Sequence, residues 1–156
     1  MNVKEYIQSW ADSYKKDLTE NIMPFWMEHG WDRVNGGVYT CVNRDGSLMD
    51  TTKSVWFQGR FAFICAFAYN NIEKNQEWLD AAKSTLEFIE KHCFDEQGHM
   101  YFSVTAEGQP LRKRRYVFSE TFAAIAMSEY ALATGDQHWA QRALQVFEDT
   151  QRFLAT

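Results

Sequence analysis

Apolar positions along the chain predict five helices of two kinds. Residues 2–23 carry apolar side chains at steps of three and four, typical of an amphipathic helix, and Pro24 is expected to stop or kink it. Residues 52–70 and 117–133 are apolar nearly all round, which predicts helices buried on every side. Residues 76–92 and 137–154 are apolar on one side only, which predicts helices with a solvent-facing surface.

The pattern of one fully apolar helix followed by one half-apolar helix occurs twice. The residues that align between the two copies are Val55 with Val117, Gln58 with Glu120, and Trp78 with Trp139. The repeat is therefore about 60 residues long, a length typical of helical arrays. Short β-prone runs between glycine turns predict a small hairpin near 36–44 and another near 99–106.

Alternating buried and half-buried helices favour an inner and an outer ring, which is an α/α toroid. An open solenoid would expose one side of every helix and would not need all-apolar inner helices. A ring of six pairs needs on the order of 360 residues at this repeat length, whereas the chain supplies about two and a half pairs. We expect an all-α fold in which residues 1–156 form the N-terminal part of an (α/α)6 toroid, with short β-hairpins between the helix pairs. The helices over 52–70 and 117–133 are expected to be neighbours and to be more buried than the others.

Composition and charge exclude several classes of protein. Hydrophobic residues make up 46% of the 156 positions, which is too many for a disordered chain. The formal net charge of −5 argues against a nucleic-acid partner, because phosphate binding needs surplus Lys and Arg. No apolar run is long enough to span a membrane. The three cysteines are scattered and no export signal is recognised, so we expect a cytoplasmic protein. The spacing of the histidines and cysteines does not match that of a metal site.

Polar residues at the starts of the two all-apolar helices are the candidates for chemistry, because burying them is costly unless something binds them. The two clusters are 56–60 (Trp-Phe-Gln-Gly-Arg) and 115–120 (Arg-Tyr-Val-Phe-Ser-Glu), and they occupy matching places in the two repeats. The donors of Arg60 suit hydroxyl, carboxylate or phosphate groups. Alternatively, Arg60 and Glu120 form a buried pair that only locks the two inner helices. The aromatic content of 16%, with six Trp, is compatible with a sugar ligand.

Two motifs in the sequence are distinctive. The first comprises 36–41 (Gly-Gly-Val-Tyr-Thr-Cys), Asp45-Gly46 and 53–60 (Lys-Ser-Val-Trp-Phe-Gln-Gly-Arg). The second comprises 115–120 and 124–129 (Ala-Ile-Ala-Met-Ser-Glu). Together they resemble the N-acylglucosamine 2-epimerase family. The resemblance covers residues 25–135 and implies an (α/α)6 barrel of cytoplasmic, cofactor-independent sugar epimerases and isomerases. It implies that Arg60 and Tyr116 line the sugar pocket, and it extends to Trp56, Gln58 and Glu120 as further substrate-binding residues.

The chemistry implied by the resemblance is removal of the proton at C2 of an open-chain sugar, through a cis-enediolate that is then reprotonated. This needs a base with a pKa near neutral and a donor to the enediolate oxygen, a role that suits Arg60. The family's paired catalytic histidines are expected beyond Thr156, so no catalytic residue is expected in this segment and the segment alone should be inactive. The chain's own histidines, His29, His92, His99 and His138, are expected to be structural or solvated.

Two other functions remain open from the residues alone. A glycoside hydrolase or lyase on the same toroid would need two carboxylates across a cleft, with Glu120 as one and Asp45 or Asp50 as the other. A non-catalytic helical scaffold would use bare inner-helix surface to bind a partner or to form a homodimer.

Overall fold

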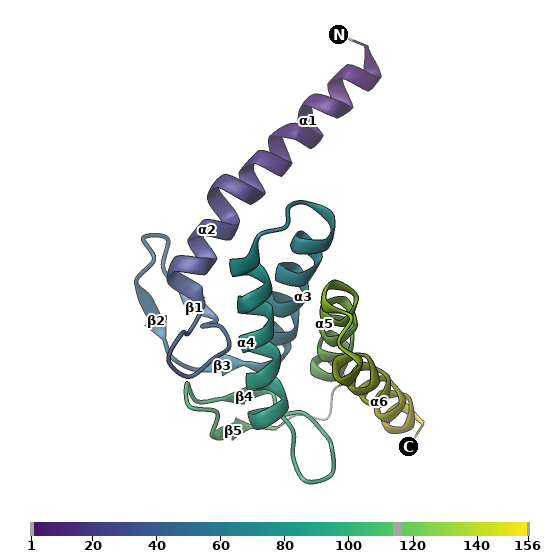
Figure 1. Cartoon of the computed structure of the whole chain (residues 1–156). Helices are drawn as coiled ribbons and strands as arrows, with labels where there is room; N and C mark the ends of the chain where they lie inside the picture. Colours follow the sequence, from purple (N-terminus) through teal and green to yellow (C-terminus); the bar gives the residue numbers. More distant parts are fainter. Residues whose placement is uncertain (1, 114–116, 156) are drawn as a thin grey trace.

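The computed structural model of the chain describes residues 2–113 and 117–155. Figure 1 shows pairs of antiparallel helices with short strands between the pairs, and the first helix projects from the rest. The helical segments are α1 (Val3–Asp17), η1 (Leu18–Ile22), α2 (Met23–Phe25), η2 (Trp26–Gly30), α3 (Val55–Asn71), α4 (Gln76–His92), α5 (Phe118–Thr134) and α6 (Gln137–Leu154). The strands are β1 (Cys41–Val42), β2 (Leu48–Asp50), β3 (Lys53–Ser54), β4 (Ser103–Val104) and β5 (Pro110–Arg112). No helix in the described ranges is long and apolar enough to cross a membrane.

The N-terminal helix does not stop at Pro24, so the first of the two outcomes expected at this proline, a stop or a kink, is wrong. Helical backbone continues from α1 to Gly30, and the proline lies in the first turn of α2 between two π-helical segments, η1 and η2. Proline cannot donate a main-chain hydrogen bond, and the wider π turns accommodate the interruption without ending the helix. A capping box starts α1: the Glu5 main-chain N–H donates to the Asn2 side chain, and the Asn2 main-chain N–H donates to the Glu5 carboxylate, each at 2.9 Å.

The two inner helices, α3 and α5, lie side by side, while α4 packs on α3 and α6 packs on α5. Gly59 allows the close approach of α3 to α5, because a Cβ atom there would lie only 2.7 Å from the main-chain carbonyl carbon of Phe122. Farther along the same interface, the Asn70 side chain donates to the carboxylate of Glu129 at 2.8 Å. The predicted pairing of the inner helices is therefore confirmed.

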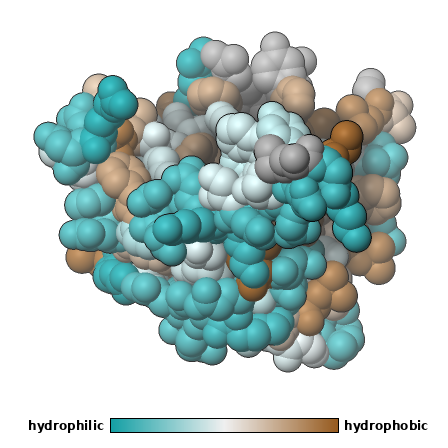
Figure 2. Space-filling view, turned by 90° about the horizontal axis from the view of Figure 1, so that it is seen from above, coloured by the Kyte–Doolittle hydropathy of each residue, from teal (hydrophilic) through white to brown (hydrophobic). Residues whose placement is uncertain are grey.

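The expectation that α3 and α5 are more buried than the other helices is wrong. Helix α4 buries eight residues, as many as α3, and α5 buries seven. The reason is that one side of each inner helix is left uncovered within the described chain, with Ile64 and Phe67 exposed on α3 and Ile125 and Leu132 exposed on α5. In Figure 2 apolar patches accordingly remain open on a surface that is otherwise largely hydrophilic.

The hairpins lie later in the chain than the sequence pattern suggests. Strand β1 pairs with β2, and β3, β4 and β5 form a three-stranded antiparallel sheet. Residues 36–40 and 99–102 form no named strand, and they take part in β pairing through the isolated bridges Trp31–Val38 and Phe94–Met100. Strand β3 occupies residues expected to be helical, so α3 begins at Val55 and the main-chain N–H of Val55 donates to Phe102 at 3.0 Å.

The loops before the hairpins repeat as faithfully as the helices do. In the first repeat, the Asp32 carboxylate accepts main-chain hydrogen bonds from Val34 and Asn35, each at 3.0 Å. In the second repeat, Asp95 accepts from Gln97 and His99, each at 2.9 Å. Gly36 and Gly98 follow these aspartates with φ values of +82° and +83°, so both turns need the left-handed conformation that glycine adopts readily.

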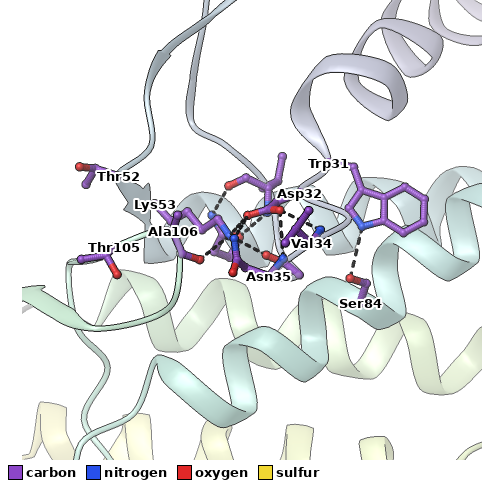
Figure 3. A network of polar contacts seen from close by, with 12 residues as sticks. Trp31, Asp32, Val34, Asn35, Thr52, Lys53, Ser84, Thr105 and Ala106 are labelled. Carbon is purple, nitrogen blue, oxygen red and sulfur yellow. Dashed lines mark hydrogen bonds and ion pairs between the residues drawn. The ribbon is translucent and has the colours of Figure 1, made fainter.

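The Lys53 side chain connects the two repeats from within the core (Figure 3). It is 0% exposed, and its Nζ donates to the Asp32 carboxylate at 2.7 Å, to the Gly36 carbonyl at 2.7 Å and to the Ala106 carbonyl at 2.8 Å. Burial of Asp32 opposes its ionisation, but hydrogen bonds from Lys53, Asn35 and Val34 outweigh it and lower the pKa of Asp32 to about 2. In the second repeat Lys113 pairs with Asp95, and the Lys113 side chain is 49% exposed.

Lys53→Met should therefore destabilise the chain far more than Lys113→Met. Removing Lys53 leaves a buried carboxylate and two buried carbonyls without their partner, at a cost of about 3–5 kcal/mol. Removing the exposed Lys113 should cost only about 0–1 kcal/mol. Urea unfolding of both variants measures the difference, and equal losses would show that the Lys53 contacts do not join the repeats.

Candidate functional site

A cavity of about 430 Å³ opens where the first turns of α3 and α5 meet the segment leading into β4. Its walls are mainly aromatic. The lining residues are Trp56, Arg60, Met100, Tyr101, Phe102, Phe118, Ser119 and Phe122. The two sequence clusters at the starts of the inner helices therefore do meet at one end of the molecule, as the repeat predicts.

Arg60 lies at this cavity with its guanidinium near two neighbouring aromatic rings, whose centroids are 6.0 Å apart. The Cζ atom is 5.6 Å from the Trp56 ring centroid and 5.5 Å from that of Phe122, within the range of cation–π contact. The side chain is exposed, and no carboxylate in the described ranges forms an ion pair with it. The alternative in which Arg60 and Glu120 form a buried lock is wrong, because Glu120 bonds to main chain instead. The guanidinium donors are available to a ligand.

Gln58 lies on the other side of α3 and is 0% exposed. Its Oε1 accepts from the Val38 N–H at 2.7 Å, and its Nε2 donates to the carbonyls of Val38 at 2.8 Å and Ser54 at 3.3 Å. The amide is fully used within the fold. This corrects the expectation that Gln58 binds substrate, since no polar atom of its side chain faces the cavity.

Glu120 is the counterpart of Gln58 on α5 and is 2% exposed. Its Oε1 accepts from the Met100 N–H at 2.8 Å, and its Oε2 is buried without a hydrogen-bond partner in the described chain. Burial raises the pKa of Glu120, and the hydrogen bond from Met100 only partly offsets this effect. Trp56 lines the cavity directly. Tyr116, the remaining candidate, lies outside the described residues.

The hydrolase hypothesis finds no support in the carboxylates. Asp45 accepts from the hydroxyl and N–H of Ser47 at 2.7 and 2.9 Å, and Asp50 accepts from the Thr52 N–H at 2.7 Å. Those hydrogen bonds lower the pKa of both aspartates and commit them to loop structure. The buried Glu120 presents no carboxyl to a cleft shared with either.

The chain's four histidines are used in the fold or on its surface, as expected. His29 and His92 stack over Gly46 and Gly108, the equivalent turn glycines of the two hairpins. His99 stacks on Phe153 with a centroid distance of 3.7 Å, and His138 lies 3.1 Å from Glu90. None of them lines the cavity. No group of His, Cys, Asp or Glu in the described ranges is arranged to hold a metal ion.

Sequence reasoning missed the three wall residues that come from the loop, Met100, Tyr101 and Phe102, and it did not single out Phe118 and Phe122 of α5 as site residues. The signal for the helical pair was present, because both fall on the positions of Trp56 and Arg60 when the repeats are aligned. The loop residues carry no such signal, since their position depends on the pairing of β3 with β4.

Comparison with known proteins agrees with this architecture. The sequence pattern of the N-acylglucosamine 2-epimerase (GlcNAc 2-epimerase) family matches residues 37–155. The chain belongs to the N-acylglucosamine 2-epimerase family. It is 34% identical over 149 residues to N-acylglucosamine 2-epimerase from Rattus norvegicus, covering 93% of this chain and 35% of the rat protein. It is 32% identical over 140 residues to cellobiose 2-epimerase from Ruminococcus albus, covering 88% and 36%.

A solved sugar epimerase from a ruminal bacterium superposes with a TM-score of 0.80 at 32% identity, covering 88% of this chain and 36% of that one. The structural neighbours in this family are (α/α)6 epimerases, which agrees with the predicted fold class. The chain spans about a third of the length of the curated relatives it matches, and it corresponds to their N-terminal portion.

The positions of Arg60 and Gln58, two residues apart, predict losses of stability of very different size. Arg60→Lys should lower the free energy of unfolding by no more than about 1 kcal/mol, because the side chain is exposed and loses only ring contacts. Gln58→Ala should cost roughly 1–3 kcal/mol for each main-chain group of Val38 that it leaves buried and unpaired. Urea unfolding measures both, and a larger loss in Arg60→Lys than in Gln58→Ala would contradict the assignment.

Proposed function

We propose that this chain is part of a carbohydrate epimerase or isomerase that acts at C2 of a small-molecule sugar. The observation that carries the proposal is the Arg60 guanidinium, which lies near the Trp56 and Phe122 rings at an aromatic cavity and pairs with no described carboxylate. The family membership supplies the class of reaction, because the relatives bear the names of N-acylglucosamine and cellobiose 2-epimerases.

The proposed reaction is a proton transfer without a cofactor. A base removes the proton from C2 of the open-chain aldehyde, and the C2–H electrons form the C1–C2 double bond of a cis-enediolate with negative charge on O1. Return of a proton to the opposite face of C2 gives the epimer. Return of a proton to C1 gives the ketose, because the O2 hydroxyl then loses its proton as the C2 carbonyl forms and O1 takes up a proton. Aromatic faces suit the apolar faces of a sugar, and the Arg60 donors suit the developing charge on O1.

The base is proposed to lie in the part of the relatives' length that this chain does not match. This agrees with the positions of the four histidines, none of which lines the cavity. We also propose a cytoplasmic location, supported by three cysteines that are all free thiols. The exposed apolar sides of α3 and α5 support a contact with further protein, either more of the same polypeptide or a homodimer partner.

The 156-residue chain by itself should show no epimerase activity. Proton exchange at C2 can be followed by NMR in deuterated water with N-acetylmannosamine, mannose and cellobiose. Deuterium incorporation should equal that of the buffer without protein, because the proposed base is absent from the chain. Incorporation above this level would require one of the chain's own histidines to act as the base.

In a protein that continues this chain to the length of its relatives, Arg60→Lys should lower kcat by roughly 100-fold or more. The change keeps the charge but loses the planar fork, and one lost oxyanion donor costs about 2.7–4 kcal/mol. The thermal midpoint should hardly change. Arg142→Lys is the matched control, because the Arg142 guanidinium also lies over a ring, 4.6 Å from the Phe94 centroid, but does not line the cavity. Normal kcat in Arg60→Lys would remove Arg60 from the mechanism.

A further inference from the structure

Gln58 and Glu120 do the same structural task in the two repeats. Each is buried in the first turns of an inner helix, and each accepts a hydrogen bond from the main-chain N–H of the residue 20 positions earlier. Those residues, Val38 and Met100, are themselves equivalent, because each closes an isolated bridge at the end of the loop. The two side chains can therefore be compared atom by atom.

The Gln58 and Glu120 side chains differ in one polar atom. At Gln58 the second polar atom is the donor Nε2, which bonds to the Val38 carbonyl at 2.8 Å. At Glu120 the corresponding atom is Oε2, which is buried and has no hydrogen-bond partner in the described chain. An ionised carboxylate would place an acceptor and a charge where the repeat uses a donor, and both are costly in a buried position.

No lysine or arginine in the described ranges forms an ion pair with Glu120. Arg60 lies near the Trp56 and Phe122 rings, and Lys113 binds Asp95. The titratable groups that act on Glu120 from the neighbouring loop are His99, which favours the ionised form, and Asp95, which opposes it. These two influences have opposite signs, so burial decides the outcome.

We propose that Glu120 is a neutral carboxylic acid whose Oε2 proton donates to the Met100 carbonyl, in the place of the Nε2–H of Gln58, and that it thereby positions the Met100–Phe102 wall of the cavity. Burial raises the pKa of Glu120, in the direction that the geometry requires. Ser119, the preceding residue, also holds this wall, with its hydroxyl 3.4 Å from the Tyr101 carbonyl. Glu120 is a positioning residue, and the inference does not depend on the proposed epimerase activity.

A neutral Glu120 makes the stability of the fold depend on pH in a defined direction. A carboxyl group whose pKa is higher in the folded state contributes stability below its ordinary pKa of 4.5, and that contribution is lost as the pH rises through the raised value. Glu120→Gln replaces the proton with an amide donor at all pH values. The thermal midpoints of the wild type and Glu120→Gln should therefore be close near about pH 4.5, and the variant should become progressively more stable than the wild type towards about pH 8.5.

Glu96→Gln is the matched control, because Glu96 is an exposed carboxylate in the loop between α4 and Met100. Its midpoint should differ from that of the wild type by the same amount at every pH in this range. For Glu120→Gln, a difference that is constant or that shrinks with rising pH would overturn the proposal.

A direct titration gives a second, independent test that needs no variant. The side-chain carboxyl carbon of Glu120, labelled with carbon-13 and assigned through its bonds to the main chain, should titrate with a midpoint above 4.5. A midpoint at or below that value would show an ionised Glu120 and overturn the proposal. Neither experiment contains a sugar, so failure of the proposed function would leave both results intact.

Discussion

The Lys53 ammonium group is the contact on which the arrangement of the two repeats depends. It satisfies the Asp32 carboxylate and the Gly36 carbonyl of the first loop and, at the same time, the Ala106 carbonyl of the second hairpin. Because Lys53 also begins β3, the same residue sets the register of β3 against β4. That register brings the Phe102 carbonyl to the first N–H of α3 and so fixes one wall of the cavity.

Equivalent residues of the two repeats lie at the same places in the fold but differ in side chain or in exposure. Lys53 is fully buried, whereas Lys113 is half exposed, yet each pairs with the aspartate that caps its own loop. Gln58 and Glu120 likewise hold equivalent main-chain atoms with different side chains. A buried loop requires that its polar groups be satisfied, and more than one side chain can meet that requirement. The two loops are consequently more alike in their hydrogen bonds than in their amino-acid sequences.

The sequence predicted the helices well where their apolar pattern has a single explanation. The helix over 76–92 has the predicted bounds because its one-sided pattern begins at a capping residue, Asn75, whose side chain accepts from the Glu77 N–H. The apolar pattern does not predict burial, because it shows that a residue is apolar but not which element covers it. Ile64 and Ile125 are apolar and exposed, so the relative burial of the inner helices could not be read from composition.

The positions of the site residues follow from helix geometry that a linear motif hides. Successive residues in a helix are turned by about 100°, so positions i and i+4 share a face while i+2 points to nearly the opposite side. Trp56 and Arg60 therefore reach the cavity together, as Phe118 and Phe122 do on α5.

The middle residue of each set, Gln58 or Glu120, must point away from the cavity and into the loop. The polar and aromatic residues at the start of an inner helix therefore lie on two opposite faces of that helix and make different contacts. One face lines the cavity, and the other face holds the main chain that forms the rest of the cavity wall.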